Sequence, residues 1–410
     1  MPDDKKVAIK KINAVGPMKA LMAAYFKELD EASKSGKKKV AWCTSVGPAE
    51  LLRSLGFLVY FPENHGAMLG STRMAADLIP AANAVGYSPD ICSYLTSDIG
   101  SFILGKTPLQ AMGIDGPPKP DVLVYNTSQC RDVQDWMYWY HRELGVPVLG
   151  IETHRGIPEI TDVHVRSVSR QMQDMIEPLE KIAGRKFDMG ELKEVLRISR
   201  ETTLAWERIL RAAEHVPSPI TFFDGTIHMG PAVVLRGDQR ATDYYNLLGA
   251  ELEERIQNGV GAVDGERRRI YWEGMPIWGK LREHAELFAM HGGCVVCSTY
   301  CNSWIFKAFD PDDPFTSMAR AYLEIFIIRD EMFKERYITE MIDKYRVDGI
   351  LFHDSKTCPN NSNNRYGMPE RLHKLNIPNI TLHADLNDLR CYSEEQGRTN
   401  IEAFMEQLGG

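Results

Sequence analysis

The sequence contains no long apolar run, no excess of basic residues and no internal repeat or low-complexity segment. No stretch approaches about 18 consecutive apolar residues, so we expect no membrane-spanning helix. The net charge of −8 argues against a protein that binds nucleic acid. The N-terminus, MPDDKKVAIKK, is charged and has no apolar signal segment, so we expect a cytoplasmic protein.

The chain of 410 residues is too long for one hydrophobic core, and we expect two or three domains. After a leading helix at 16–35, short apolar runs alternate with helical patterns such as WMYWYHRELG (136–145). The predicted strands of this part are KKVAWCTS (38–45), FLVYFP (57–62), DVLVYNT (121–127) and VPVLGIE (146–152). Strands that alternate with helices predict a parallel, doubly wound sheet.

A second set of strands follows a long, charged helical stretch. The later predicted strands are RRRIYWEG (267–274), GGCVVCSTY (292–300), DGILFHDS (348–355) and NITLHAD (379–385). We therefore predict an α/β fold with two doubly wound, Rossmann- or flavodoxin-like lobes of parallel sheet, joined by a helical segment. The expected boundaries are 1–160 for the N-terminal lobe with its leading helix, 161–264 for the helical segment and 265–410 for the C-terminal lobe.

Eight cysteines are present, and in a cytoplasmic chain they are expected to be buried thiols, metal ligands or reactive groups, not disulfides. Cys130 and Cys358 each follow a predicted strand closely, and Cys92 lies in a loop-to-helix segment. Ligand sites of open α/β sheets lie beyond the carboxyl ends of the strands. Three thiolates that meet there can hold an iron–sulfur cluster and leave one iron open. On spacing alone the cluster is a weak prediction, because isolated buried cysteines are more often inert.

A competing metal pattern is Cys294-x-x-Cys297-x-x-x-Cys301, with His291 as the only nearby fourth ligand for zinc. Cys294 and Cys297 lie in or beside a predicted strand, where alternation points them to opposite faces. The alternative is an ordinary strand with small buried residues.

The stretch GSFILGKT (100–107) matches the phosphate-binding P-loop pattern. A working P-loop follows a buried strand, so that its backbone N–H groups point at the phosphates. The preceding residues read as a helix, and the intervening SFIL is apolar. We therefore predict a helix that ends at Gly105, with Lys106 near its C-terminus, and no nucleotide site.

Several segments together resemble a known family. They are CTSVGPAEL (43–51), YFPENHG (60–66), DICSYLTSDIG (90–100), YNTSQC (125–130) and HDSKTC (353–358). In their order and spacing they are similar to the 2-hydroxyacyl-CoA dehydratase and benzoyl-CoA reductase family. The stretch from SPITFFDG (218–225) to DPDDPFTSMA (310–319) is most similar to the B-type subunits of ATP-dependent benzoyl-CoA reductases.

The resemblance implies that Cys92, Cys130 and Cys358 are ligands of one [4Fe–4S] cluster, and that the Cys294 group carries no ligand. It places Ser45 and Glu63 near the open iron, as catalytic residues. It further implies an acyl-CoA substrate, a homologous partner subunit with a second cluster, and a separate ATP-dependent activator that donates electrons.

Six further side chains are candidates by position and chemistry. His65 and His353 are possible proton donors. Trp136, Tyr138, Trp139 and Tyr140 are expected mostly in the core, although some of them are candidates for the wall of an acyl pocket.

The leading functional hypothesis is the iron–sulfur subunit of a benzoyl-CoA reductase-like enzyme, which reduces an aromatic acyl-CoA thioester by one electron through a ketyl radical. One alternative is a subunit of an (R)-2-hydroxyacyl-CoA dehydratase, which forms an enoyl-CoA by radical dehydration. The other is a non-catalytic electron-relay subunit.

Overall fold

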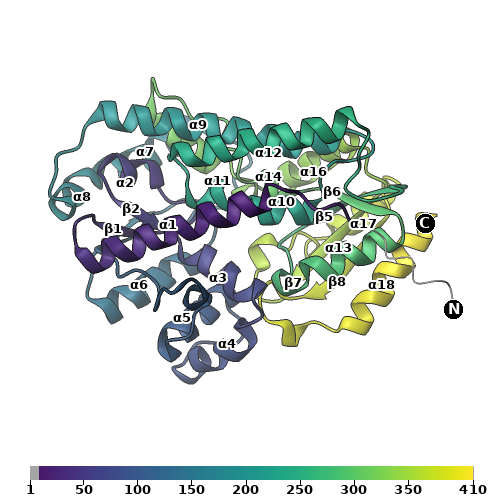
Figure 1. Cartoon of the computed structure of the whole chain (residues 1–410), viewed down its shortest axis with the longest axis horizontal. Helices are drawn as coiled ribbons and strands as arrows, with labels where there is room; N and C mark the ends of the chain where they lie inside the picture. The colour runs from purple at the N-terminus through teal and green to yellow at the C-terminus, as the bar shows by residue number, and fades with distance from the viewer. Residues whose placement is uncertain (1–8, 410) are drawn as a thin grey trace.

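The computed structural model describes residues 9–409, which form two α/β lobes connected by long helices (Figure 1). The first lobe contains a four-stranded sheet in the order β2-β1-β3-β4, and the second contains one in the order β6-β5-β7-β8. All neighbouring strands are parallel. The predicted fold class of two doubly wound lobes is therefore confirmed. Among residues 9–409, no helix is both long and apolar enough to cross a membrane.

The strands are short, and six of the eight are buried at nearly every position, while the edge strands β4 and β8 are mostly half-buried. Those of the first lobe are β1 (Val40–Cys43), β2 (Leu58–Tyr60), β3 (Val122–Asn126) and β4 (Val148–Ile151). Those of the second are β5 (Arg268–Glu273), β6 (Gly293–Ser298), β7 (Gly349–Ser355) and β8 (Asn379–Ala384). Runs such as VLVYN, buried at every position in β3, suit strands that are covered by helices on both faces.

In each sheet, the second strand of the chain lies on one side of the first strand, and the later strands lie on the other side. Open α/β sheets bind ligands at such a switch point. This point lies between β1 and β3 in the first lobe and between β5 and β7 in the second. The loops beyond these strands carry Ser45, Cys130 and Cys358.

The helices of the first lobe surround its sheet. They are α1 (Val15–Ser35), α2 (Ala49–Ser54), α3 (Pro62–Ser71), α4 (Ala75–Ala84), α5 (Ser93–Leu104) and α6 (Asp132–Leu144). Those of the second lobe are α13 (Leu281–Met290), α14 (Thr299–Asn302), α15 (Pro314–Leu323), α16 (Glu331–Tyr345), α17 (Met368–Lys374) and α18 (Glu394–Gln407).

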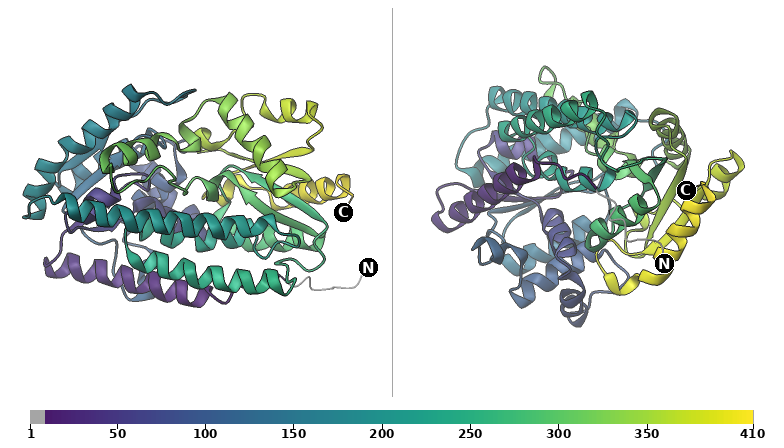
Figure 2. Two further views of the ribbon diagram at one scale, coloured as in Figure 1. Left: turned by 90° about the horizontal axis from the view of Figure 1, so that it is seen from above. Right: turned by 45° about the vertical axis from the view of Figure 1, so that its right-hand side comes forward.

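The intervening segment is helical, as the sequence predicts. It consists of α7 (Asp162–Asp174), α8 (Ile176–Ala183), α9 (Met189–Arg211), α10 (Phe222–His228), α11 (Gly230–Val234) and α12 (Gln239–Gln257). The two long helices α9 and α12 pack along each other, and α1 lies beside α12 (Figure 2). This segment therefore contributes to the packing of both lobes, since α9 also contacts α2 of the first lobe and α14 of the second.

The predicted helix that ends at Gly105 is confirmed. Helix α5 runs through Gly100, and Gly105 caps it with a left-handed φ of 61°. A Cβ atom at Gly100 would lie 2.0 Å from the backbone oxygen of Leu78 in α4. Helices α4 and α5 thus approach each other closely at the first glycine of the P-loop-like pattern. A side chain at this position would force the two helices apart.

Candidate functional site

Three loops bring Cys92, Cys130 and Cys358 into one neighbourhood. Cys92 is the residue before α5, Cys130 lies between β3 and α6, and Cys358 follows β7. All three are free thiols. Burial, and after it the nearby Cys130 and Cys358 thiols, raise the pKa of Cys92 well above its ordinary value. Cys92 and Cys358, which are 266 positions apart in the chain, therefore lie close together in space.

Hydrogen bonds connect the segments that carry these cysteines. The Cys92 amide donates to Asp132 Oδ2 at 3.4 Å, and the Ser93 amide donates to Thr357 Oγ1 at 3.0 Å. At the end of β8, the Asp385 carboxylate accepts hydrogen bonds from Ser93 Oγ at 2.5 Å and from the Thr357 amide at 2.9 Å. A buried carboxylate with several donors is strongly stabilised, so Asp385 holds the first lobe against the second at this point.

The arrangement is not that of a mononuclear metal site. Within residues 9–409, no group of three or more His, Cys, Asp or Glu side chains is placed to hold a single metal ion. Ligands of a cluster each bind a different iron atom, so they need not converge on one point.

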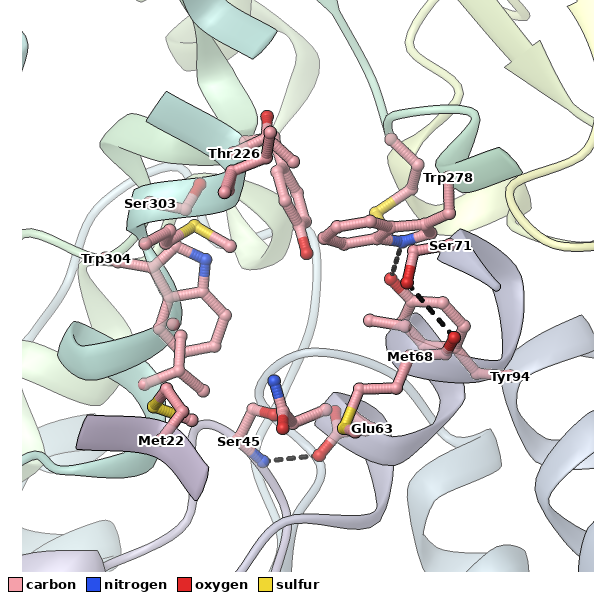
Figure 3. Close-up of a pocket in the computed structure, with 18 of the residues that line it drawn as sticks. Met22, Ser45, Glu63, Met68, Ser71, Tyr94, Thr226, Trp278, Ser303 and Trp304 are labelled. Atoms are coloured by element: carbon pink, nitrogen blue, oxygen red, sulfur yellow. Dashed lines mark hydrogen bonds between the residues drawn. The ribbon is translucent and has the colours of Figure 1, made fainter. Parts of the chain in front are cut away.

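A cavity of about 600 Å³ lies between the two lobes and the helical segment (Figure 3). Its apolar wall includes Met18, Met22, Phe26, Met68, Met229, Val233 and Met275. Its polar and aromatic wall includes Ser45, Glu63, Tyr94, Gln129, Trp278, Tyr300, Trp304 and Asn361. A mostly apolar cavity with a few polar groups is typical of a small-molecule site.

Glu63 is the buried carboxyl group of this cavity. It lies at the start of α3, directly after β2, and is 5% exposed. The Ser45 amide donates to one carboxylate oxygen, as the dashed line in Figure 3 shows, and Gln129 Nε2 donates to the other. Burial raises the pKa of Glu63 to about 7, although these hydrogen bonds act in the opposite direction. The carboxyl group can therefore hold or release a proton near neutral pH.

Gln129 is a site residue that the sequence analysis missed. Its Oε1 atom accepts a hydrogen bond from the Val46 amide at 3.2 Å, while its Nε2 atom donates to Glu63. It thereby connects the loop after β1 to α3. One feature of the sequence indicated that Gln129 belongs to the site: this residue immediately precedes Cys130 in the segment YNTSQC.

Arg236 supports the loop that carries Ser45. Its guanidinium group donates to the Ser45 carbonyl oxygen at 2.9 Å and to the Gly47 carbonyl oxygen at 2.5 Å. Its Nε atom lies 2.7 Å from Glu50 Oε1, and both side chains are at most 2% exposed. This buried ion pair joins the helical segment to the first lobe.

Replacing Arg236 by methionine is expected to lower the free energy of unfolding by about 3–5 kcal/mol, because it leaves the Glu50 carboxylate buried without its partner. Denaturant-induced unfolding measures the change. The matched control is Arg197→Met: Arg197 is 43% exposed and pairs with Glu194 and Glu201 on the surface. This control should cost no more than about 1 kcal/mol, and an equal loss in both variants would contradict the argument.

The two candidate histidines do not belong to the cavity wall. His65 is buried, with Nδ1 2.5 Å from Asp98 Oδ1 and Nε2 2.7 Å from Thr107 Oγ1. His353 Nδ1 donates to the Met275 carbonyl oxygen at 2.6 Å. Both rings therefore hold neighbouring segments in place, and the geometry gives no support to a direct role as proton donor.

Three of the four aromatic residues of α6 are core residues, and none of the four lines the cavity. Trp136 Nε1 and Tyr140 OH both donate to Asp98 Oδ2, at 3.0 and 2.5 Å, and Trp139 is buried beside them. Tyr138 is 39% exposed. The aromatic wall of the cavity comes from other segments, which the sequence analysis did not identify.

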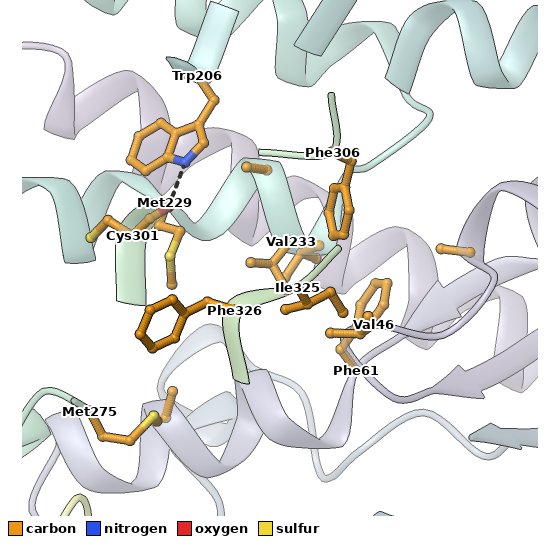
Figure 4. Close-up of a cluster of buried hydrophobic side chains, with 14 of the residues drawn as sticks. Val46, Phe61, Trp206, Met229, Val233, Met275, Cys301, Phe306, Ile325 and Phe326 are labelled. Atoms are coloured by element: carbon orange, nitrogen blue, oxygen red, sulfur yellow. Dashed lines mark hydrogen bonds between the residues drawn. The ribbon is translucent and has the colours of Figure 1, made fainter. Parts of the chain in front are cut away.

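The strand interpretation of the Cys294 group is confirmed. Cys294 and Cys297 are buried within β6, and Cys301 lies in α14. Figure 4 shows Cys301 in a cluster of apolar side chains near Met229, where its carbonyl oxygen accepts a hydrogen bond from Trp206 Nε1 at 3.1 Å.

Comparison with known proteins identifies the family. The model of the 2-hydroxyglutaryl-CoA dehydratase D-component family matches residues 44–408. The (R)-phenyllactyl-CoA dehydratase alpha subunit of Clostridium sporogenes is 28% identical over 92% of this chain and 91% of its own length. The (R)-2-hydroxyisocaproyl-CoA dehydratase alpha subunit of Clostridioides difficile is 29% identical, over 95% of this chain and 94% of its own.

The B subunit of benzoyl-CoA reductase from Thauera aromatica is 27% identical to this chain, over 95% of this chain and 93% of its own length. The relatives thus include dehydratases and a reductase, the two enzyme classes that the sequence analysis expected, and each is named as one subunit of an enzyme. The resemblance noted from the sequence is therefore confirmed. The chain belongs to the 2-hydroxyglutaryl-CoA dehydratase D-component family.

Proposed function

We propose that this chain is the iron–sulfur subunit of an enzyme that reduces an acyl-CoA thioester by single electrons, with a [4Fe–4S] cluster held by Cys92, Cys130 and Cys358. The observation that carries the proposal is the relation between the cysteines and the cavity. Each cysteine segment supplies a residue to the cavity wall: Tyr94, Gln129 and Asn361. An acyl group in the cavity would therefore lie beside the loops that hold the cluster.

The donor set fits such a cluster. Three free thiols lie within electrostatic reach of one another, on loops that hydrogen bonds connect. When bound through three cysteines, the cluster supplies electron transfer and one iron open to an oxygen ligand.

The residues of the chain itself bind the acyl group and handle protons. The apolar wall excludes water, which strengthens every polar interaction inside the cavity. Glu63 holds a proton at its carboxyl group near neutral pH, and the Ser45 and Gln129 donors fix its orientation. Such a group can deliver a proton to a substrate atom that gains negative charge on reduction.

The proposal includes partners. The relatives are named as alpha or B subunits, which supports a homologous partner subunit. We further propose that the partner carries a second cluster and that a separate ATP-dependent activator supplies the electrons.

The leading reaction is the reduction of an aromatic acyl-CoA such as benzoyl-CoA, which the similarity to the reductase relative supports. The second candidate is the dehydration of an (R)-2-hydroxyacyl-CoA to an enoyl-CoA, which the similarity to the dehydratase alpha subunits supports equally. The size of the cavity is compatible with either acyl group.

Anaerobic assays of the complex with its partner and activator, using benzoyl-CoA and an (R)-2-hydroxyacyl-CoA in parallel, separate the two reactions. We expect turnover of one thioester and its loss when the activator or ATP is omitted. If neither thioester binds or reacts although the cluster is intact, the electron-relay hypothesis replaces this proposal.

A further inference from the structure

Arg155 is a basic residue beside the cysteine loops that the proposed function does not use. It lies in the loop after β4, and Cys130 lies in the loop after the neighbouring strand β3. These two loops meet, because parallel neighbouring strands end at the same edge of a sheet. The Thr153 amide donates to Thr127 Oγ1 at 2.9 Å, and Arg155 Nη1 donates to the Gln129 carbonyl oxygen at 2.6 Å. The guanidinium group is thus bonded to the residue that precedes Cys130.

Further hydrogen bonds hold this loop against the second lobe. The Gly156 and Ile157 amides donate to the Ile328 carbonyl oxygen at 2.9 and 3.2 Å. Arg155 Nη2 donates to the Ile327 carbonyl oxygen at 3.3 Å. One backbone acceptor from each lobe therefore positions the guanidinium group, although the side chain remains accessible to solvent.

The charge of Arg155 acts on the cysteines that we assign to the cluster. Burial raises the pKa of the Cys358 thiol to about 12, and the Asp385 and Asp132 carboxylates act in the same direction. The Arg155 guanidinium acts against them, because a positive charge favours the thiolate. The charges at Cys130 and Cys358 in turn favour the protonated guanidinium group. The positive charge of Arg155 therefore lies among acidic groups at this site.

A positive charge near an iron–sulfur cluster changes the reduction potential of the cluster. Reduction adds one electron, so the reduced cluster is more negative than the oxidised cluster by one unit charge. A neighbouring cation stabilises the reduced cluster more than the oxidised one, and the reduction potential becomes less negative. Solvent contact at Arg155 screens the charge and keeps this effect moderate.

We propose that Arg155 raises the reduction potential of the proposed cluster through the positive charge of its guanidinium group. This inference rests on the proposed function. It gives Arg155 no contact with the substrate, since this side chain does not line the cavity. Its two hydrogen bonds to backbone carbonyl oxygens hold the charge at a fixed place beside Cys130.

The test is a redox titration of the full chain after anaerobic reconstitution, with titanium(III) citrate as the electron donor. Electron paramagnetic resonance measures the fraction of reduced cluster at each potential. Arg155→Gln removes the charge but keeps a side chain that can donate hydrogen bonds. At a fixed potential, its ratio of reduced to oxidised cluster should be about 3- to 10-fold lower than that of the wild type, as expected for one screened charge. Its midpoint potential is then more negative, while iron and sulfide per chain should be unchanged.

Two further variants separate the charge from other effects. Arg155→Lys keeps the positive charge but changes the hydrogen-bonding geometry, so its midpoint potential should stay close to the wild-type value. Arg346 is a matched control, since it is also exposed and also donates to a backbone carbonyl oxygen, that of Glu214. It precedes β7, whereas Cys358 follows β7, so it lies at the opposite end of that strand. Arg346→Gln should therefore leave the midpoint potential unchanged.

The outcomes distinguish the inference from the proposed function. If the wild type holds no iron–sulfur cluster, the proposed function fails. If the wild type holds the cluster and Arg155→Gln has the same midpoint potential, the role of Arg155 is overturned. An equal shift in Arg155→Lys or in Arg346→Gln would also overturn it, because the nearby charge would not be the cause. Loss of iron in Arg155→Gln would overturn it as well, because Arg155 would then be required to assemble the site.

Discussion

The variant Cys130→Ala is expected to lose most of the iron and sulfide that the wild-type protein holds after anaerobic reconstitution. The loop between β3 and α6 brings Cys130 close to Cys92 and Cys358. We assign these three thiolates as the protein ligands of the cluster. Removing one leaves two iron atoms without a protein ligand. Cys92→Ala and Cys358→Ala should have the same effect, measured as iron and sulfide per chain together with the absorption spectrum.

The matched control is Cys297→Ala, which also removes a buried free thiol, but from within strand β6. It should retain the full iron content. Full iron retention in Cys130→Ala, or an equal loss in Cys297→Ala, would show that the ligand assignment is wrong.

The second large effect is expected at Glu63. Glu63→Gln should lower kcat by about 10²- to 10⁴-fold, the usual contribution of a general acid or base, and leave the iron content unchanged. The substitution keeps the shape of the side chain and an oxygen that accepts the Ser45 amide, but its amide nitrogen cannot accept from Gln129 Nε2, so it removes both the proton and that hydrogen bond. Ser45→Ala should also lower turnover without loss of iron, since Ser45 lines the same cavity.

The pH dependence provides an independent check on Glu63. Its pKa is raised to about 7, so the carboxyl group is protonated below that pH and ionised above it. If Glu63 donates a proton, activity should fall as the pH rises through about 7, and this limb should be absent in Glu63→Gln. The partly exposed Glu402 of α18 offers a control, since Glu402→Gln should leave both kcat and the pH profile unchanged. Full activity of Glu63→Gln at every pH would exclude the catalytic role.

The sequence predicted the elements that depend on local pattern. Continuous apolar runs such as VAWC and VLVYN became buried strands, and their alternation with helices predicted two parallel sheets. The helix that ends at Gly105 was also readable, because a glycine after an apolar helical run favours the left-handed cap. The predicted strand ends differ from the observed ones by at most two residues, since the terminal residues of such runs belong to turns or to the next helix.

The candidate site was predicted only in part. The position of Cys130 and Cys358 after strands placed them at the ligand-binding edges, but only a family resemblance joined them to Cys92, Ser45 and Glu63. The structure then added Gln129 and the three aromatic residues Tyr94, Trp278 and Tyr300.

What the sequence by itself determined is the order and type of the elements, because helix and strand periodicity are properties of neighbouring residues. Only the tertiary structure decided which side chains meet. Trp278 and Tyr94 are 184 residues apart, and their hydrogen bond exists because two lobes with equivalent topology face one cavity. Burial in that cavity, which no local pattern encodes, also moves the pKa of Glu63 to about 7.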